Sequence, residues 1–351
     1  MGSDPSESPQ QNEWGQTPIG QTPTGGKIMN ILQLAADIID GKRLTKEDDL
    51  SFFKDADLDD LKKGADQIRE HFCGDKVDLC TIISGRSGKC SENCKFCAQS
   101  AHHHTSCDVY DLLDEDTIVN AARANQEEGV DRFAIVNSGK GPTPEEFEKI
   151  IHIYERMRDE LKINLCTSLG FLTTEQFQRL KDAGVTGIHN NIETSKEYFD
   201  KICTTHSFQD KIENIKRAQS VGLSVCSGGI IGMGETFEDR ISMALTLGEL
   251  GIKSIPVNSL MPIPGTPLEN QTRLTEDEII RTITMFRFIN PEADIRLAGG
   301  RALMANDGKE TFSAGASASI TGNMLTTSGS TIASDKEMLT ELGRDVTPCW
   351  A

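Results

Sequence analysis

The sequence contains no run of about 18 consecutive apolar residues, the length that a membrane-spanning helix needs. It also lacks the apolar stretch behind a basic start that marks a secretory signal peptide. Basic residues are fewer than acidic ones. The sequence contains 36 Lys and Arg but 54 Asp and Glu, so its formal net charge is -18. Such a charge repels phosphate backbones and anionic lipid surfaces. We therefore expect a cytoplasmic protein that has neither nucleic acid nor a membrane as a partner.

Proline is sparse as well, with 12 residues, whereas 37% of the 351 residues are apolar and 26% are charged. This composition is that of a globular protein able to bury a core. The 10 cysteines are too few for a small disulfide scaffold, so reduced thiols or metal ligands are the better interpretation. The length exceeds that of a usual single core, but closed α/β barrels reach it as one domain.

The chain divides into three parts by composition. Residues 1–28 are rich in Gly, Pro, Ser, Gln and Thr, and we exclude them from the fold as either an added leader or a natural disordered tail. Residues 29–347 are expected to form the folded body, with N-terminal helices, and residues 348–351 a short C-terminal tail. The body begins with a helical pattern from Met29 and a second amphipathic stretch over Thr45–Phe72.

Short β-type runs then alternate with helical stretches. Eight runs are found: VDLCTII at 77, DRFAIVNS at 131, INLCTSLG at 163, TGIHNNIE at 186, LSVCSGGII at 223, SIPVNSL at 254, DIRLAGG at 294 and SASITGN at 317. Eight strands with helices between them predict a (β/α)8 barrel of the TIM type with an N-terminal helical extension.

Residue parity within these runs predicts what lines the barrel, since alternate side chains of a strand point to opposite faces. One parity is apolar and is expected to face the helices. The other parity carries the polar and thiol side chains, among them Asn164, Cys166, Ser168, His189, Asn191, Glu193, Ser224, Cys226 and Arg296. Ordinary barrel interiors are filled with Val, Ile and Leu. A polar, thiol-bearing interior therefore predicts a site.

Three cysteines follow the first expected strand in a C-x3-C-x2-C pattern, Cys90, Cys94 and Cys97, with Phe96 before the last. Three thiolates in eight residues can bind three irons of a cube and leave the fourth open. The alternative is a structural zinc site, which usually pairs C-x2-C elements and needs a fourth ligand. The run His102–His104 could supply one, although we expect it to be a solvated loop.

This loop resembles that of the radical S-adenosylmethionine superfamily and, within it, the biotin synthase family. The resemblance covers about residues 29–347. It is carried by CSENCKFCAQS at 90, LCTSLG at 165, ETSKEYFDKICTTHSFQDKIENI at 193, VCSGGIIGMGE at 225, PVNSLMPIPGTPL at 256, IRLAGGR at 295 and AGASASITGNMLTT at 314. It implies a 4Fe-4S cluster on Cys90, Cys94 and Cys97 as the catalytic centre.

The resemblance also implies how S-adenosylmethionine is bound and used. Its amino acid end binds the open iron and meets the backbone at Asn137, Ser138 and Gly139. Asn191 and Glu193 hold the ribose, and the adenine side is formed by Gly228, Ile230, Gly232 and Glu235. One electron releases a 5'-deoxyadenosyl radical, and two such radicals are needed to insert one sulfur into dethiobiotin. Each electron implies a flavodoxin or ferredoxin, and the family implies a homodimer and iron-sulfur assembly machinery as partners.

Members of the family carry a second, sulfur-donating cluster, usually 2Fe-2S, held by three strand cysteines and one arginine. Cys166, Cys226 and Arg296 match three of these ligands, but Ala134 stands where the remaining cysteine is usual. His189 and Glu193 also depart from the usual Asn and Asp. We hypothesise that Cys80, on the inward parity of the first strand, replaces the missing ligand and alters the cluster. The alternative is that Cys80 is a packed apolar residue and sulfur insertion is lost.

The resemblance assigns Asn258 to the ureido ring of dethiobiotin and places His189 and Arg296 near the substrate. Four other cysteines are expected to be incidental, because they have no partner at ligand spacing: Cys73, Cys107, Cys203 and Cys349. A sister enzyme, such as a hydrogenase maturase or the lysine mutase of pyrrolysine synthesis, is the nearest alternative function. A non-catalytic iron-sulfur or zinc scaffold is the alternative of another class.

Overall fold

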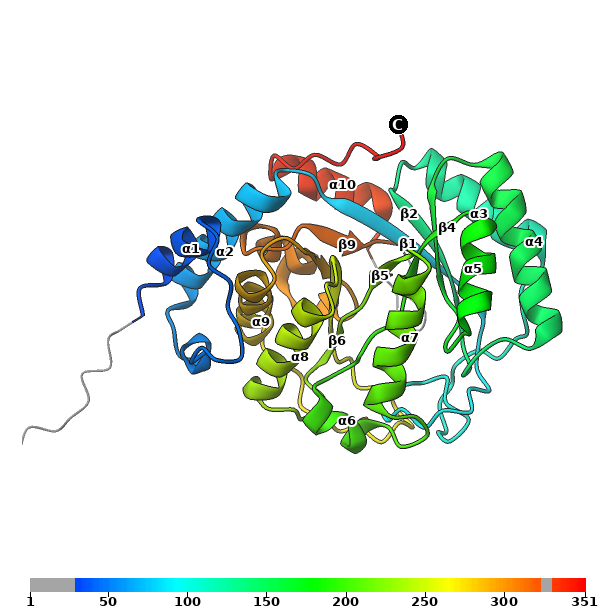
Figure 1. The fold of residues 1–351 in the computed structure, drawn as a ribbon, viewed down its shortest axis with the longest axis horizontal. Helices are drawn as coiled ribbons and strands as arrows, with labels where there is room; N and C mark the ends of the chain where they lie inside the picture. Colours follow the sequence, from blue (N-terminus) through cyan, green and yellow to red (C-terminus); the bar gives the residue numbers. More distant parts are fainter. Residues whose placement is uncertain (1–28, 323–329) are drawn as a thin grey trace, which may run out of the picture.

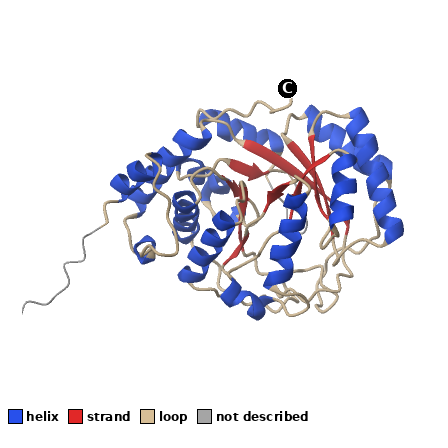
Figure 2. Cartoon of the chain, viewed as in Figure 1, coloured by secondary structure: helices blue, strands red, loops and turns tan. Residues whose placement is uncertain are grey.

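The computed structural model describes residues 29–322 and 330–351. Residues 1–28, which we expected to be a leader or tail, lie outside the described residues. Figure 2 shows strands at the centre of the molecule with helices around them. This arrangement confirms the TIM-type barrel with an N-terminal helical extension.

All the strand pairings are parallel, and they close the sheet on itself in the order β5-β4-β3-β2-β1-β9-β8-β7-β6, with β5 also paired to β7. Because β5 and β6 follow one another in a single position, the described strands fill eight positions. Their bounds are β1 Asp78–Arg86, β2 Arg132–Asn137, β3 Asn164–Ser168, β4 Val185–His189, β5 Ser224–Cys226, β6 Gly229–Ile231, β7 Ser254–Ser259, β8 Asp294–Leu297 and β9 Ala318–Ile320.

The run LSVCSGGII, expected as one strand, is thus broken at Ser227 and Gly228. The cause is a close approach of two strands. A Cβ on Gly228 would overlap the carbonyl oxygen of Pro256 on β7, and the Gly228 amide donates to Asn191 Oδ1 (3.1 Å) and not to the sheet. Only glycine allows this approach.

Helices surround the barrel and connect its strands (Figure 1). They are α3 Glu115–Glu127, α4 Pro144–Glu160, α5 Thr174–Asp182, α6 Lys196–Ile202, α7 Phe208–Ser220, α8 Phe237–Glu249 and α9 Glu276–Ile289, with 3-10 turns η2 Arg301–Leu303 and η3 Ala305–Ser313 before β9 and helix α10 Ile332–Glu341 after it. Many start with an N-cap side chain that bonds the third helical amide, as at Thr143 and Thr275.

The N-terminal extension consists of α1 Ile31–Ile39, a 3-10 turn η1 Ser51–Lys54 and α2 Leu58–Cys73. Figure 1 shows α1 and α2 at one side of the barrel, next to α9. The expected start of the second helix at Thr45 is wrong, because Asp57 caps α2 by accepting from the Asp60 amide. The extension packs on α9 through Phe53, whose ring lies 5.5 Å from that of Phe288. Both rings are fully buried.

The loops at the carboxyl ends of the strands gather at one end of the barrel, at the bottom of the view in Figure 1. This is the end at which TIM barrels carry their sites. At the opposite end the last residues pack against the barrel, with Trp350 Nε1 donating to the Val130 carbonyl (2.8 Å) and the Cys349 amide to Asp131 (2.8 Å). Among the described residues, no helix is long and apolar enough to cross a membrane.

Candidate active site

A cavity of about 540 Å³ runs through the barrel interior. Its lining includes the end of the cysteine loop, at Phe96, Cys97 and Gln99. Deeper in, it is lined by His189, Asn191, Ile230, Asn258, Cys80, Arg132, Ala134, Cys166, Cys226 and Arg296. The inward direction expected for Cys166, His189, Asn191, Cys226 and Arg296 is therefore confirmed, whereas Asn164, Ser168 and Glu193 do not belong to this lining. One space joins the loop of Cys97 to the thiols within the barrel.

The loop that carries Cys90, Cys94 and Cys97 is held by its own backbone. The Cys90 amide donates to the Gln99 carbonyl (3.0 Å), and the Ala101 amide donates back to the Cys90 carbonyl (2.8 Å). The Cys97 amide donates to the Cys94 carbonyl (3.0 Å). His103 Nδ1 donates to the Cys97 carbonyl (2.9 Å). These bonds fix a compact turn with three thiols on it.

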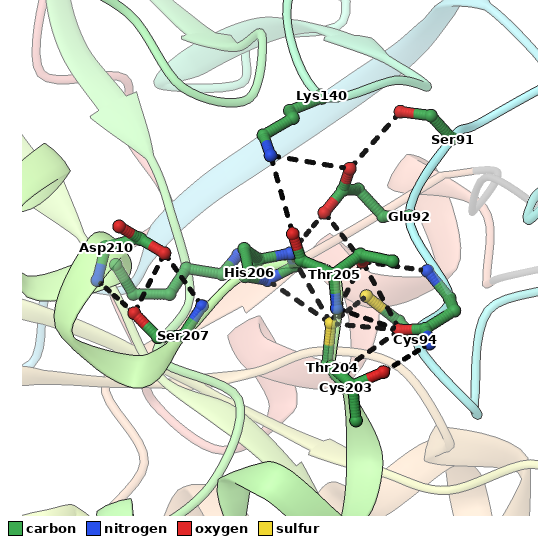
Figure 3. A network of polar contacts seen from close by, with 12 residues as sticks. Ser91, Glu92, Cys94, Lys140, Cys203, Thr204, Thr205, His206, Ser207 and Asp210 are labelled. Carbon is green, nitrogen blue, oxygen red and sulfur yellow. Dashed lines mark hydrogen bonds and ion pairs between the residues drawn. The ribbon is translucent and has the colours of Figure 1, made fainter.

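The same loop is fastened to a distant segment, residues 203–206 between α6 and α7. Asn93 Nδ2 donates to Thr204 Oγ1 (2.7 Å), and Asn93 Oδ1 accepts from the Thr204 amide (2.9 Å). The Lys95 amide donates to the Ile202 carbonyl (2.9 Å). Figure 3 shows the two segments side by side.

The expectation that Cys203 is incidental is wrong in one respect, because its thiol lies 3.7 Å from the Cys94 thiol. Cys203 is 2% exposed and also contacts His206 Nδ1 at 3.4 Å. The hydrogen bond from Cys94 lowers the pKa of the Cys203 thiol to about 3, and the same bond raises the pKa of Cys94. Sequence spacing missed this contact because 109 residues separate the partners.

The thiols of Cys90, Cys94 and Cys97 do not lie close enough together to bind one metal ion jointly. Within residues 29–322 and 330–351, Cys94, Cys203 and His206 are the one group of three such ligands whose atoms all lie within 4.8 Å of one another. A cube binds its thiolates through different irons and so holds them further apart than one ion does. The wider spacing of the loop thiols therefore argues against the zinc alternative with His102–His104. Two members of that run, His102 and His104, are exposed as expected.

The strand end at Asn137, Ser138 and Gly139 supports the cysteine loop. Ser138 Oγ donates to the Gly88 carbonyl (2.7 Å), and the Ser138 amide donates to the Arg86 carbonyl (3.0 Å). Asn137 Nδ2 donates to Glu146 (3.3 Å), but its Oδ1 is buried with no partner in the structure. A buried acceptor without a donor marks a place where a ligand group can bind.

A second unpartnered acceptor lies at the end of β4. Glu193 has a left-handed φ of 70°. Its main chain pairs with β6, since the Ile230 amide donates to the Glu193 carbonyl (2.9 Å). Its Oε1 lies 4.0 Å from Lys211 Nζ, whereas Oε2 is buried without a partner. Burial raises the pKa of the Glu193 carboxyl, an effect that Lys211 opposes.

The segment from Gly228 to Glu235 forms β6 and a tight turn, as expected. Glu235 closes the turn by accepting from the Gly232 amide (2.7 Å) and the Met233 amide (2.7 Å). Its carboxylate also pairs with Arg240 Nε (2.7 Å) and is 1% exposed. Glu235 is therefore a structural residue of this turn, while Ile230 faces the cavity.

Three thiols face the deep part of the cavity, and no two of them lie on adjacent strands. Cys80 on β1 pairs in register with Arg132, while Ala134 pairs with Ile82 and Cys166. Cys80 therefore lies two residues closer to the amino-terminal end of β1 than Ile82, the residue that pairs with Ala134. Burial raises the pKa of the Cys80 and Cys166 thiols; each is also raised by the Cys226 thiol and lowered by an arginine.

Cys226 differs from the other two because of its neighbours. Burial opposes ionisation, yet the imidazole of His189 lowers the pKa of the Cys226 thiol to about 7. Ser254 Oγ adds a hydrogen bond to Cys226 Sγ at 3.3 Å. His189, expected near the substrate, pairs in register with Cys226 on the neighbouring strand, and both residues line the cavity. Burial lowers the pKa of His189, but Cys226 outweighs this and the net shift is upward.

Arg296 was expected to be a ligand of the second cluster, and in this structure the chain itself supplies a counter-ion for its charge. Asp78 Oδ1 lies 2.5 Å from Arg296 Nη2, and Asp78 Oδ2 accepts from Arg132 Nε (2.9 Å). Arg296 Nη1 donates to the carbonyls of Asp78 and Ser319, both at 3.0 Å. The inward parity of Asp78 was visible in the sequence, but its pairing with two arginines was not.

Asn258 lines the cavity and joins two strand ends. Its Nδ2 donates to the Gly229 carbonyl (3.1 Å), and its Oδ1 accepts from the Gly299 amide (2.9 Å). An amide has two N–H groups and two lone pairs on its oxygen, so one of each remains for a ligand. The structure thus combines a bridging role with the capacity to bind a cyclic urea.

Among the residues that the structure describes, Cys73, Cys107 and Cys349 belong to no group of three potential metal ligands. Cys73 accepts from Arg287 Nη1 (3.4 Å), and Cys349 accepts from Asn164 Nδ2 (3.1 Å). Cys107 lies in the loop after the cluster cysteines and is half-buried.

Two families match the chain. Residues 86–247 match the Radical SAM superfamily, and residues 256–345 match the Biotin and Thiamin Synthesis associated domain. The first range contains the cysteine loop, and the second contains Asn258 and Arg296.

Curated relatives match nearly the whole chain. Biotin synthase of Alkaliphilus metalliredigens is 56% identical over 315 residues, which cover 90% of this chain and 99% of the relative. Biotin synthase of Clostridium beijerinckii is 56% identical over 311 residues, covering 89% of this chain and 98% of the relative.

Solved structures with the same fold are more distant in sequence. Methylornithine synthase superimposes with a TM-score of 0.78 at 20% identity, covering 90% of this chain and 97% of that structure. The FeFe-hydrogenase maturase of Carboxydothermus hydrogenoformans gives 0.75 at 18% identity, covering 90% and 78%. These are the sister enzymes considered above, and at such identities they share the fold alone with this chain.

Proposed function

The chain belongs to the biotin synthase family, and from this premise we propose how its own residues divide the work of converting dethiobiotin to biotin. Membership establishes a radical S-adenosylmethionine enzyme with a 4Fe-4S cluster, dethiobiotin as substrate and a need for a reductant. The proposals below concern the residues that bind these groups and the source of the inserted sulfur.

Cys90, Cys94 and Cys97 hold the 4Fe-4S cluster. Their loop is anchored through backbone bonds at both ends, so the three thiols are presented from one turn. Three thiolates leave one iron of the cube open for S-adenosylmethionine. When bound, these groups supply the electron and the adenosyl radical.

S-adenosylmethionine binds between the loop and the ends of β2, β4 and β6. The observation that supports it is that two of the buried acceptors without partners, Asn137 Oδ1 and Glu193 Oε2, belong to these segments. Glu193 and Asn191 offer acceptors for the ribose hydroxyls, and the backbone at Asn137, Ser138 and Gly139 faces the amino acid end. Ile230, Gly228 and Gly232 form the surface for the adenine, while Glu235 holds that turn in shape.

An auxiliary iron-sulfur cluster, the donor of the inserted sulfur, binds to Cys80, Cys166 and Cys226. All three thiols line the same cavity as Asn258 and the cysteine loop. Ala134 offers no ligand, and the thiol proposed to replace it, Cys80, lies on the neighbouring strand β1 opposite Arg132, two residues before Ala134. The ligand positions of this cluster therefore differ from those of the usual 2Fe-2S cluster. A different number of irons would follow from that change.

Arg296 lies beside this cluster and does not ligate it. Its guanidinium donates to Asp78, to two carbonyls and to Ser254 Oγ, so its nitrogens are engaged in hydrogen bonds. Because these contacts engage Nε, Nη1 and Nη2, we do not give Arg296 the ligand position that the family's arginine holds. Arg296 and Arg132 instead place positive charge against an anionic group.

Dethiobiotin binds between the two clusters, with its ureido ring at Asn258. The remaining N–H and lone pair of Asn258 complement a cyclic urea, and the barrel wall excludes water from the reacting carbons. His189, on the far side of Cys226 from Ser254, positions that thiolate and is not assigned a substrate contact.

The observation that carries the proposal is the shared cavity of three thiols and Asn258. Cys80→Ala tests it, with Cys107→Ala as the matched control. We expect anaerobically purified Cys80→Ala to lose auxiliary iron and sulfide and biotin formation while 5'-deoxyadenosine is still produced. Wild-type iron, sulfide and biotin yield in Cys80→Ala, with loss of yield in Cys166→Ala, would show that Cys80 is a packed residue.

The partners follow from the chemistry. The reductant is a flavodoxin or ferredoxin, the clusters are loaded by iron-sulfur assembly machinery, and the enzyme acts as a cytoplasmic homodimer. Reduction assays with each purified carrier and sedimentation of the holoenzyme test the first and last of these predictions.

A further inference from the structure

The group formed by Cys94, Cys203, His206 and Glu92 is not explained by the cofactors assigned above. Its four members come from two segments that the fold brings together, and Cys203, His206 and Glu92 are each less than 9% exposed. Figure 3 shows the two sulfur atoms next to each other, with His206 beside them and Glu92 between Lys140 and Thr205.

The spacing of the ligand atoms is that of a single tetrahedral ion. Two thiolates at about 2.3 Å from zinc lie about 3.8 Å apart, and a thiolate and an imidazole nitrogen lie about 3.5 Å apart. The thiols of Cys94 and Cys203 are 3.7 Å apart, and His206 Nε2 lies 3.7 Å from Cys203 Sγ. These two distances match those of a single ion, and the ligand atoms of Cys94, Cys203 and His206 all lie within 4.8 Å of one another.

The imidazole is also oriented as metal-binding histidines are. Glu92 Oε2 lies 2.5 Å from His206 Nδ1, so this nitrogen donates its proton to the carboxylate and Nε2 keeps its lone pair. Thr205 Oγ1 donates to the same oxygen (2.8 Å), and Lys140 Nζ lies 4.0 Å from Oε1. Phe171 and Phe199 pack edge-on against the ring, at 5.1 and 5.7 Å. A carboxylate that bonds the second nitrogen of a ligating histidine strengthens metal binding.

We propose that in the cluster-free chain Cys94, Cys203 and His206 bind one divalent transition-metal ion, iron or zinc, with Glu92 as the positioning residue for His206. Binding displaces the Cys94 thiol proton to solvent and transfers no electron, so the step needs no oxidant. Two thiolates neutralise the ion, which suits a buried site. Three protein ligands leave the fourth position to water, so the ion is exchangeable.

The consequence concerns cluster loading. Because Cys94 is also a proposed ligand of the 4Fe-4S cluster, this inference rests in part on the proposed function. The ion and the cluster compete for one thiolate, and zinc in the site therefore delays cluster assembly until it leaves.

Cobalt titration of the cluster-free full-length chain under anaerobic, reducing conditions is the first test. We expect one Co2+ per chain, with the intense visible bands of a tetrahedral ion and thiolate charge-transfer absorption that Zn2+ abolishes. Cys203→Ser and His206→Ala should lose these signals, and Glu92→Gln should weaken binding about 10- to 100-fold. Cys107→Ser is the matched control and should bind like wild type.

Three cysteine variants separate this inference from the assignment of the cluster ligands. Cys90→Ser should keep the Co2+ site and lose the 4Fe-4S cluster, Cys203→Ser should do the reverse, and Cys94→Ser should lose both. A Cys94→Ser variant that loses Co2+ but keeps the cluster would overturn the cluster assignment and leave the ion site standing.

Reconstitution with iron and sulfide after preloading with one equivalent of Zn2+ tests the competition. Zinc should slow cluster formation in wild type and have no effect in Cys203→Ser, whose fold is checked by circular dichroism. An octahedral Co2+ spectrum, or tetrahedral binding unchanged in both Cys203→Ser and His206→Ala, would overturn the proposal. So would an air-dependent loss of two titratable thiols in place of ion binding, which would identify a disulfide pair.

Discussion

Arg296 and Asp78 form an ion pair inside the barrel, with Arg296 Nη2 2.5 Å from Asp78 Oδ1. Arg296 is 3% exposed, and the same carboxylate also accepts from Arg132. One carboxylate therefore balances two guanidinium groups at the floor of the cavity. Both guanidinium groups line the cavity in which an anionic cluster is proposed to bind.

Removing the charge of Asp78 is expected to destabilise the protein strongly. Asp78→Asn leaves two guanidinium groups without their counter-ion, one of them fully buried, and breaking a buried pair costs about 3–5 kcal/mol. Chemical denaturation of the cluster-free chain measures this loss. Asp59→Asn, which removes an exposed pair with Lys62, is the control and should leave the denaturation midpoint nearly unchanged.

The same pair predicts a dependence of stability on pH. Burial alone would raise the pKa of the Asp78 carboxyl, but Arg296 and Arg132 hold it below its usual value. The folded state then binds a proton less readily than the unfolded state, so the stabilisation is present above the unfolded pKa of about 3.9 and is lost as pH falls through the folded value. Denaturation midpoints of wild type should fall on acidification more steeply than those of Asp78→Asn; parallel slopes would contradict the assignment.

Radical formation is expected to require Cys94. Cys94→Ala removes one of three proposed iron ligands, so anaerobic reconstitution followed by reduction in the presence of S-adenosylmethionine should yield almost no 5'-deoxyadenosine. Production near the wild-type level would refute the ligand assignment. Cys73→Ala, at a thiol that contacts Arg287 far from the cavity, should retain production.

Asn258→Ala is expected to weaken dethiobiotin binding. Loss of one buried hydrogen-bonding partner costs about 1–3 kcal/mol, or about 5- to 150-fold in the dissociation constant. Because Asn258 also joins Gly229 to Gly299, the variant should be less stable too, and binding is to be measured well below its unfolding temperature. An unchanged dissociation constant would mean that the ureido ring binds elsewhere.

Gly228→Ala is expected to be among the most damaging glycine substitutions. The added methyl would overlap the Pro256 carbonyl, a backbone atom that cannot move aside as a side chain can. Overpacking of this kind costs about 1–3 kcal/mol, and the backbone contact points to the upper end. Gly343→Ala, where the new Cβ meets nothing within 4 Å but φ is +73°, should cost about 1–2 kcal/mol from backbone strain.

Strand periodicity predicted the barrel and the inward thiols because both depend on local alternation. Cys80, Cys166 and Cys226 stand on the polar parity of their strands, and each lines the cavity. The break at Gly228 was not predicted, since it arises from the approach of Pro256 on a neighbouring strand.

Relationships between distant segments account for what the sequence did not show. The contact of Cys203 with Cys94 requires two loops to meet, and no spacing rule links positions 109 residues apart. The C-x2-H pattern of Cys203 and His206 was the available signal. The role of Asp78 was missed for the same reason, because its inward parity was visible but its partners on β2 and β8 were not.

The fastening of the cysteine loop to residues 203–206 has a consequence for biosynthesis. Asn93 bonds Thr204, which is 111 residues further along the chain. A ribosome therefore releases all three cysteines of the loop well before the segment that holds them in place. During that interval the thiols are on an untethered loop, and cluster insertion into a nascent chain would meet ligands that are not yet positioned. The order of synthesis thus favours insertion after translation has passed α6.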